Sequence, residues 1–275
     1  MRLAVYQGPG ASGDVPANLA TIRRVAARAA AEGAGLVVFP ELFTTGYKLG
    51  ARLRELAEPL SGPSVDAIGA AAAQAGLAIL TGFCEREGER LFNSAVLVGR
   101  DGSVLTMHRK CHLFGEAELE LFTPGDALAV VELERLRVGI LICYDVEFPE
   151  AVRALALAGA ELVAVPTALM APYDLVARTL VPARAAENQV FVAYANRTGS
   201  EGDLAYIGQS CIVGPDGADL ARAGRDEESL LIADLDPTAI TDARAGYCYL
   251  DERRPELYTP PTRTSNPPAR RAGTA

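Results

Sequence analysis

Short apolar runs rich in β-branched residues alternate with alanine-rich stretches along most of the chain. The apolar runs predict strands over residues 3–7, 36–39, 77–83, 93–98, 138–143, 162–165, 190–194, 210–213 and 230–233. The alanine-rich stretches predict helices over residues 16–32, 65–75, 149–158 and much of 175–188. Strands that are apolar at successive positions are typical of sheets covered by helices. The pattern therefore predicts an α/β fold.

The length and composition fit one large domain followed by a tail. The chain has 275 residues, 49% of them hydrophobic, which is enough to bury a sizeable core. No linker interrupts residues 1–250, which we expect to form one domain. Residues 251–275 form a C-terminal tail whose last part, from Pro260, is rich in proline, arginine and small residues. Such a composition predicts a disordered end or a strap over the surface.

The net charge limits the possible partners, and the cysteine pattern argues against a disulfide framework. The net charge is −9 and there is no basic run, which argues against nucleic acid or an anionic membrane as a partner. No signal peptide or membrane span is visible, so we expect a cytoplasmic protein. The five cysteines are scattered without CxxC spacing, and in a reducing compartment they are thiols.

Three segments place a reactive side chain at or just after the end of an apolar strand, where sites gather in α/β folds. Glu41 follows a strand in LVVFPELFTTGY, Lys110 lies in HRKCHLFGEAELELFTPGD, and Cys143 ends a strand in VGILICYDVEFPE. Each alone could be a loop carboxylate, a surface lysine or a core thiol. Amide hydrolysis, however, needs a nucleophile, a base and positive charge facing the developing oxyanion. These three residue types together can supply all of them.

A metal site is the main alternative in this part of the chain. His108, His112 and Glu116 are spaced by four residues, as zinc ligands on a helix can be. The stretch over residues 104–108 is strand-like, however, and Gly115 interrupts a helix. Extended geometry would scatter the three side chains, so we expect no metal.

The three segments match, in order and spacing, the Glu–Lys–Cys triad segments of the nitrilase superfamily of carbon–nitrogen hydrolases. The chain resembles that superfamily over residues 1–236. The resemblance implies a four-layer αββα sandwich, a homodimer and no cofactor. It also implies Glu41 as general base, Lys110 as the cation that stabilises the oxyanion, and Cys143 as nucleophile.

Members of the superfamily often have a second glutamate near the lysine segment. Counting back from TPGD makes Glu118 the best match, with Glu116 and Glu120 as alternatives.

The resemblance is greatest to 5-aminopentanamidases, through the segments YQG, RKCHLFGE, CYDVEFPE, PTALMAPYD and GQSCIVGPDG. Nitrilases proper usually have Trp–Glu after the cysteine, whereas this chain has Tyr144–Asp145 and no tryptophan. This difference favours an amidase acting on a small aliphatic primary amide, with 5-aminopentanamide among the expected substrates. The alternatives are an N-carbamoyl amine hydrolase or a nitrilase on the same triad, and a non-catalytic binding protein on the same fold.

Candidate substrate contacts lie close to the cysteine segment. The Tyr144 backbone N–H can donate to the oxyanion. Glu147 can pair with a substrate ammonium, or it can instead stabilise the start of the helix near Pro149. Tyr173 and Asp174 are alternative contacts for the substrate tail.

Overall fold

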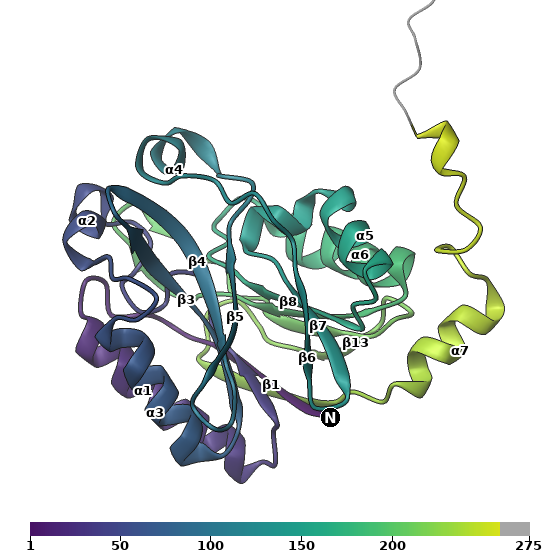
Figure 1. Cartoon of the computed structure of the whole chain (residues 1–275), viewed down its shortest axis with the longest axis horizontal. Coiled ribbons are helices and arrows are strands. Elements are labelled where there is room, and N and C mark those ends of the chain that lie inside the picture. Colours follow the sequence, from purple (N-terminus) through teal and green to yellow (C-terminus); the bar gives the residue numbers. More distant parts are fainter. Residues whose placement is uncertain (259–275) are drawn as a thin grey trace, which may run out of the picture.

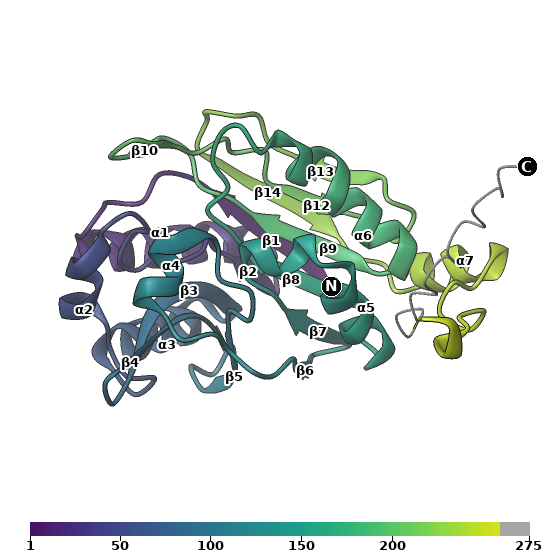
Figure 2. The ribbon, with the colours of Figure 1, turned by 90° about the horizontal axis from the view of Figure 1, so that it is seen from above.

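The computed structural model describes residues 1–258 and contains two six-stranded sheets that pack face to face (Figures 1 and 2). The first sheet has the strand order β14 (Ser229–Asp234), β1 (Arg2–Gln7), β2 (Leu36–Val38), β3 (Ala78–Glu87), β4 (Arg90–Val98) and β5 (Val104–Arg109). The second has the order β13 (Asp219–Arg222), β12 (Cys211–Val213), β9 (Phe191–Ala195), β8 (Leu162–Pro166), β7 (Leu136–Ile140) and β6 (Val130–Leu133). In each sheet three neighbouring strands are parallel: β1, β2 and β3 in the first, and β7, β8 and β9 in the second.

Helices cover the outer face of each sheet. The first sheet packs against α1 (Val15–Ala31) and α3 (Pro63–Ala75), and the second against α5 (Pro149–Leu157) and α6 (Val181–Asn188) (Figure 1). The resulting order of layers is helix, sheet, sheet, helix. The predicted αββα sandwich is therefore confirmed.

Side chains of one strand divide between two apolar layers because they alternate in direction. In β1, Leu3 and Val5 lie in the central layer between the sheets, whereas Ala4 and Tyr6 lie in the layer beneath the helices. Both faces of the strand are thus buried. This explains why the strand sequences are continuous apolar runs rather than alternating ones.

The remaining elements are short or peripheral. A two-stranded ribbon joins β10 (Ser200–Glu201) to β11 (Leu204–Ala205). Short helices are α2 (Leu53–Leu56), α4 (Gly115–Leu121), and the 3-10 segments Gly50–Arg52, Cys143–Glu147 and Pro255–Leu257, while a π-helical segment, Val176–Leu180, leads into α6. Helix α7 (Thr238–Gly246) extends away from the two sheets (Figure 1).

The predicted tail falls mostly beyond the described part of the chain. Its segment from Pro260 onward lies outside residues 1–258, and the domain boundary at residue 250 stays a prediction. No helix within residues 1–258 combines the length and the apolar character needed to cross a membrane.

One prediction of local structure near the candidate site is wrong, and one helix was not predicted. The strand predicted over residues 138–143 ends at Ile140, and Cys143 instead opens a 3-10 helix. The strand stops early because the Asp145 carboxylate accepts the Ile142 N–H at 3.1 Å, which folds the chain into a turn. Gly115 does separate His108 from Glu116, but a short helix that was not predicted, α4, begins at that glycine, whose φ of +70° starts the change of direction.

Candidate active site

The segments after β2, β5 and β7 bring Glu41, Lys110 and Cys143 close together. Glu41 is seated against β3 at Gly82, where an added Cβ would lie 2.7 Å from Glu41 Cα and 2.2 Å from Leu42 N. Leu42 itself has a φ of +45°, which a side chain-bearing residue rarely adopts. The backbone at Glu41 is thus held against β3 by a close approach of two backbone segments that only glycine allows.

Lys110 lies between two carboxylates and is fully buried. Its Nζ is 2.8 Å from Glu41 Oε1 and 2.7 Å from Glu118 Oε1. Asn93 Nδ2 donates a further hydrogen bond of 2.7 Å to Glu41 Oε1. The other oxygen, Glu41 Oε2, is buried and has no hydrogen-bond partner within residues 1–258. That oxygen is available to accept a proton.

Glu118 is held in place by groups outside its own helix. Tyr47 donates its hydroxyl to Glu118 Oε1 at 2.6 Å, and the Phe114 N–H donates to Glu118 Oε2 at 2.8 Å. Glu116 and Glu120, on the other side of α4, are exposed. Of the three glutamates, only Glu118 contacts the lysine.

The electrostatics of the cluster follow from burial and from the paired charges. Burial opposes a charge on Lys110, but Glu41 and Glu118 outweigh it and raise the pKa of the ammonium, so Lys110 is a cation at neutral pH. Burial raises the pKa of Glu41 and Glu118 raises it further, while Lys110 lowers it. A buried carboxylate with a raised pKa is a better proton acceptor than an exposed one.

Cys143 is partly buried at the start of its 3-10 helix and has a φ of +46°. Burial and the Glu41 charge raise the pKa of the thiol, while Lys110 and hydrogen bonding to Thr167 and to the Ala168 backbone lower it. The net direction is upward, so the resting group is a thiol rather than a thiolate. A nucleophilic role for Cys143 therefore needs a base to remove its proton.

The residues of the metal hypothesis do not gather as a ligand set. His108 Nε2 and His112 Nδ1 both bond to Asp145, at 3.1 and 2.8 Å, whereas Glu116 is exposed. Within residues 1–258, ligand atoms of His108, Cys111 and Asp145 do lie within 4.8 Å of one another. Both Asp145 oxygens are occupied by N–H donors, however, so this cluster is a hydrogen-bonded assembly.

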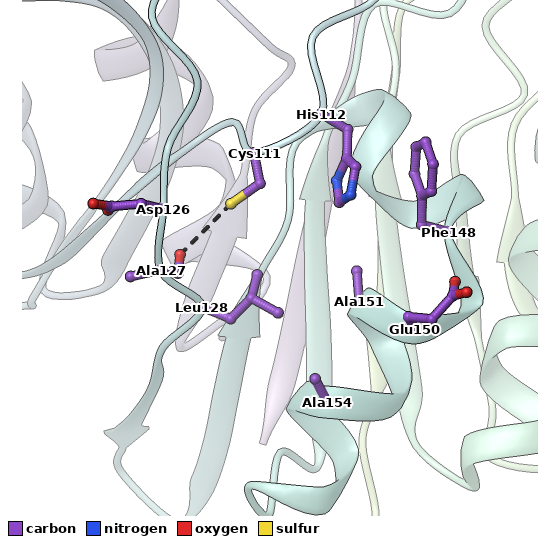
Figure 3. A pocket seen from close by; sticks show the side chains of 9 residues that line it. All are labelled: Cys111, His112, Asp126, Ala127, Leu128, Phe148, Glu150, Ala151 and Ala154. Carbon is purple, nitrogen blue, oxygen red and sulfur yellow. Dashed lines mark hydrogen bonds between the residues drawn. The ribbon is translucent and has the colours of Figure 1, made fainter. Parts of the chain in front are cut away.

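An open pocket lies beside Cys111 and His112 (Figure 3). It is lined by Cys111, His112, Asp126, Ala127, Leu128, Phe148, Glu150, Ala151 and Ala154. Glu41, Lys110 and Cys143 do not line it, so it is separate from the cluster that these three residues form.

The candidate substrate contacts have different surroundings. Phe114 packs edge-on against Tyr144 and Tyr173, with ring centroids 5.2 and 5.8 Å apart, and Tyr173 is exposed. Asp174 is engaged elsewhere, since its Oδ1 accepts a hydrogen bond from Gln209 and pairs with Arg225.

Glu147 is half-buried, and burial raises the pKa of its carboxylate although Lys110 and Arg184 lower it. The carboxylate makes no hydrogen bond to the first turn of α5, whose N-cap residue is Phe148. The proposed helix-capping role of Glu147 is therefore not supported by the hydrogen bonds of the described residues.

Several site residues were not predicted from the sequence. Tyr47 lies in the same ELFTTGY segment as Glu41, and Phe114 in the same HLFGEAE segment as Glu118, so proximity in sequence was an available signal. Asn93 gave no signal of its own, because it lies inside an apolar strand and acts only through its contact with Glu41.

A four-layer α/β sandwich with a buried lysine between two carboxylates and a thiol nearby defines a hydrolase that can work through a covalent acyl intermediate. The model of the carbon–nitrogen hydrolase family matches residues 2–245, and the chain belongs to that family. It is therefore an enzyme that hydrolyses carbon–nitrogen bonds, within the nitrilase superfamily suggested by the sequence.

Known proteins of the same family are similar over nearly the whole chain. An (R)-stereoselective amidase of Pseudomonas sp. is 40% identical over 98% of this chain and 97% of its own length. An N-carbamoylputrescine amidase of Solanum lycopersicum is 33% identical over 89% of both chains. The crystal structure of an amidase from Nesterenkonia sp. superposes with a TM-score of 0.86 at 37% identity, covering 94% of each chain.

Proposed function

We propose that this enzyme hydrolyses short aliphatic primary amides through a thioester formed on Cys143. The observation that carries the proposal is the buried Lys110 ammonium, held by Glu41 and Glu118 close to a protonated thiol. Similarity to the Nesterenkonia amidase supports it. One variant of that enzyme, lacking the active-site cysteine, has been solved in complex with butyramide, and a Glu-to-Gln variant has been solved with the acetamide moiety of fluoroacetamide covalently added at the active-site cysteine.

In the proposed mechanism, Glu41 accepts the thiol proton as Cys143 Sγ attacks the amide carbon. The negative charge that moves to the carbonyl oxygen is stabilised by the Lys110 ammonium and the Tyr144 backbone N–H. Glu41 then gives the proton to the nitrogen, the C–N bond breaks and ammonia leaves. A water molecule, deprotonated by Glu41, hydrolyses the thioester and restores the thiol. One such oxyanion donor is worth about 3–4 kcal/mol of barrier.

The test of the nucleophile is ammonia release from butyramide by the wild type and by Cys143→Ala, with Cys111→Ala and Cys248→Ala as controls. We expect turnover to disappear only in Cys143→Ala, which should stay folded by circular dichroism. Mass spectrometry after treatment with fluoroacetamide should find the adduct on the Cys143 peptide. Full activity of Cys143→Ala would rule out the mechanism.

We further propose 5-aminopentanamide as a good substrate, with Glu147 as the contact for its ammonium. Glu147 is half-buried with a raised pKa, and its carboxylate has no hydrogen bond or ion pair within residues 1–258. A cation at the far end of the substrate would compensate that desolvation. Such a pairing favours the charged substrate by roughly ten- to a hundred-fold.

The measurement compares kcat/KM on 5-aminopentanamide and on uncharged pentanamide, in the wild type and in Glu147→Gln. Glu150→Gln is the matched control, because Glu150 is an exposed carboxylate three residues further along. We expect a selective loss on the charged amide in Glu147→Gln alone. An equal loss on both amides would make Glu147 structural, and no activity on either would remove the substrate assignment.

N-carbamoyl amines are the second candidate substrate class. The likeness to the N-carbamoylputrescine amidase favours them, because N-carbamoylputrescine also carries an ammonium at the end of a four-carbon chain. A screen of ammonia release over aliphatic amides, ω-amino amides, carbamoyl amines and nitriles separates the candidates, since only the carbamoyl substrates also release carbon dioxide.

A further inference from the structure

The Asp145 carboxylate is fully buried two residues after Cys143 and accepts five N–H groups. Oδ1 accepts the backbone N–H groups of Cys111 and His112, at 3.1 and 2.8 Å, and His112 Nδ1 at 2.8 Å. Oδ2 accepts His108 Nε2 and the Ile142 N–H, both at 3.1 Å. Two oxygens thus satisfy three backbone and two side-chain donors from two separate stretches of the chain.

These donors come from the two segments that carry the reacting groups. His108 near the end of β5, and Cys111 and His112 just beyond it, flank Lys110 in sequence in the first sheet. Ile142 directly precedes Cys143 beyond β7 of the second sheet. Asp145 therefore connects residues 108–112 (the lysine segment) to residues 142–147 (the nucleophile turn), which belong to different sheets.

We propose that Asp145 is a positioning residue that sets the separation of the Cys143 thiol from the Lys110 ammonium, an inference that rests on the proposed function. Cys143 has a φ of +46°, a conformation that persists only where the surroundings impose it. The Asp145 bond to the Ile142 N–H imposes it from one side, and the bonds to the lysine segment fix where the turn lies. A misplacement of about 1 Å between reacting groups can cost about a hundred-fold in rate.

The two histidines act in this proposal as N–H donors rather than as proton carriers. Asp145 accepts hydrogen bonds, so His108 carries a proton on Nε2 and His112 carries one on Nδ1. His112 is also stacked on Phe148, with ring centroids 3.9 Å apart. The Phe148 ring follows the nucleophile turn, so this stacking adds a second contact between the same two segments.

The experiment compares substitutions that keep or remove one N–H donor. A glutamine amide places an N–H near the position of His Nε2, and an asparagine amide places one near His Nδ1. We therefore expect His108→Gln and His112→Asn to keep most of the wild-type kcat. His108→Leu and His112→Leu should each lose about ten-fold, and Asp145→Asn about a hundred-fold.

Turnover is expressed per reactive site, counted by mass spectrometry as Cys143 labelled with fluoroacetamide. We expect kcat per labelled site to fall in Asp145→Asn and the leucine variants while KM changes less than about threefold, because no substrate contact is removed. Glu58→Gln is the control for a lost carboxylate, since Glu58 accepts Ser64 N at 2.7 Å and Ser64 Oγ at 2.9 Å away from the site. It should keep kcat per site.

A purely structural role for Asp145 would lower the number of labelled sites and leave kcat per site unchanged, which would overturn the proposal. So would equal kcat in the amide and leucine variants of the same histidine, and that comparison stands even if Asp145→Asn does not fold. Failure of the proposed function is a separate result, since it would appear as full activity of Cys143→Ala.

Discussion

Glu118→Gln tests the role of Glu118, one of the two carboxylates that contact Lys110. Glu118 Oε1 accepts Lys110 Nζ at 2.7 Å and Tyr47 OH at 2.6 Å, and Oε2 accepts the Phe114 N–H at 2.8 Å. Glutamine keeps one acceptor oxygen, but its amide NH2 group replaces the other oxygen. That NH2 group then faces a hydrogen-bond donor and cannot accept from it. Losing one hydrogen bond to a charged group costs about 1.5–3 kcal/mol. We therefore expect kcat/KM to fall about ten- to a hundred-fold.

The same substitution changes the pH profile in a defined direction. The negative charge of Glu118 raises the pKa of Glu41, so its removal lowers that pKa. Glu41 must be deprotonated to accept the thiol proton, so the acidic limb of kcat/KM against pH should move to lower pH in Glu118→Gln.

The assay is ammonia release across pH for Glu118→Gln, Glu116→Gln and Glu120→Gln. The last two are matched controls, because both carboxylates are exposed on the same helix. Wild-type activity in Glu118→Gln, or an acidic limb displaced to higher pH, would refute the reasoning. Damage confined to Glu116→Gln would assign the second glutamate to that position instead.

Three further substitutions test how the site is supported. Tyr47→Phe removes the hydroxyl on Glu118 and keeps the ring, so kcat/KM should fall about ten-fold with the melting temperature nearly unchanged; unchanged kinetics would show the bond to be dispensable. Gly82→Ala forces a Cβ to within 2.2 Å of Leu42 N, so activity and thermal stability should both fall, and a normal melting curve would contradict this. Glu201→Ala leaves the fully buried Arg197 without its ion pair, and urea unfolding should show a loss of about 3–5 kcal/mol, whereas a loss below about 1 kcal/mol would contradict it.

The fold could be predicted largely from the sequence because its central strands are buried on both faces. A run such as residues 3–6 is hydrophobic at every position because sheet and helix cover its two faces, and this gives a clear pattern. The edge strands β6 and β13 were missed, since they carry exposed and charged residues and border only one neighbour. Helix α4 was missed because it is short and starts at a glycine.

The main residues of the site could be picked out from the sequence, but the contacts between them could not. Motif spacing singled out Glu41, Lys110 and Cys143, and the resemblance favoured Glu118 over its neighbours. The end of the strand before Cys143 was placed too late, because Asp145, which ends the strand by accepting the Ile142 N–H, is held in place by contacts with residues more than 30 positions away. Contacts of that range leave no local pattern in a single sequence.

The pairing of β14 with β1 has a consequence for how the protein is made. Arg2 lies opposite Asp234 in the sheet and bonds to it, although the two residues are 232 positions apart. During synthesis β1 leaves the ribosome 232 residues before its partner strand. At about 5–20 residues per second, that gap lasts roughly 10–45 s. During that time β1 is an edge strand without its partner β14, and the backbone groups of an unpaired edge strand can pair with other chains. The nascent chain is therefore prone to aggregation until residues 229–234 have been synthesised. A ribosome that stalls before them leaves a chain whose first sheet lacks β14.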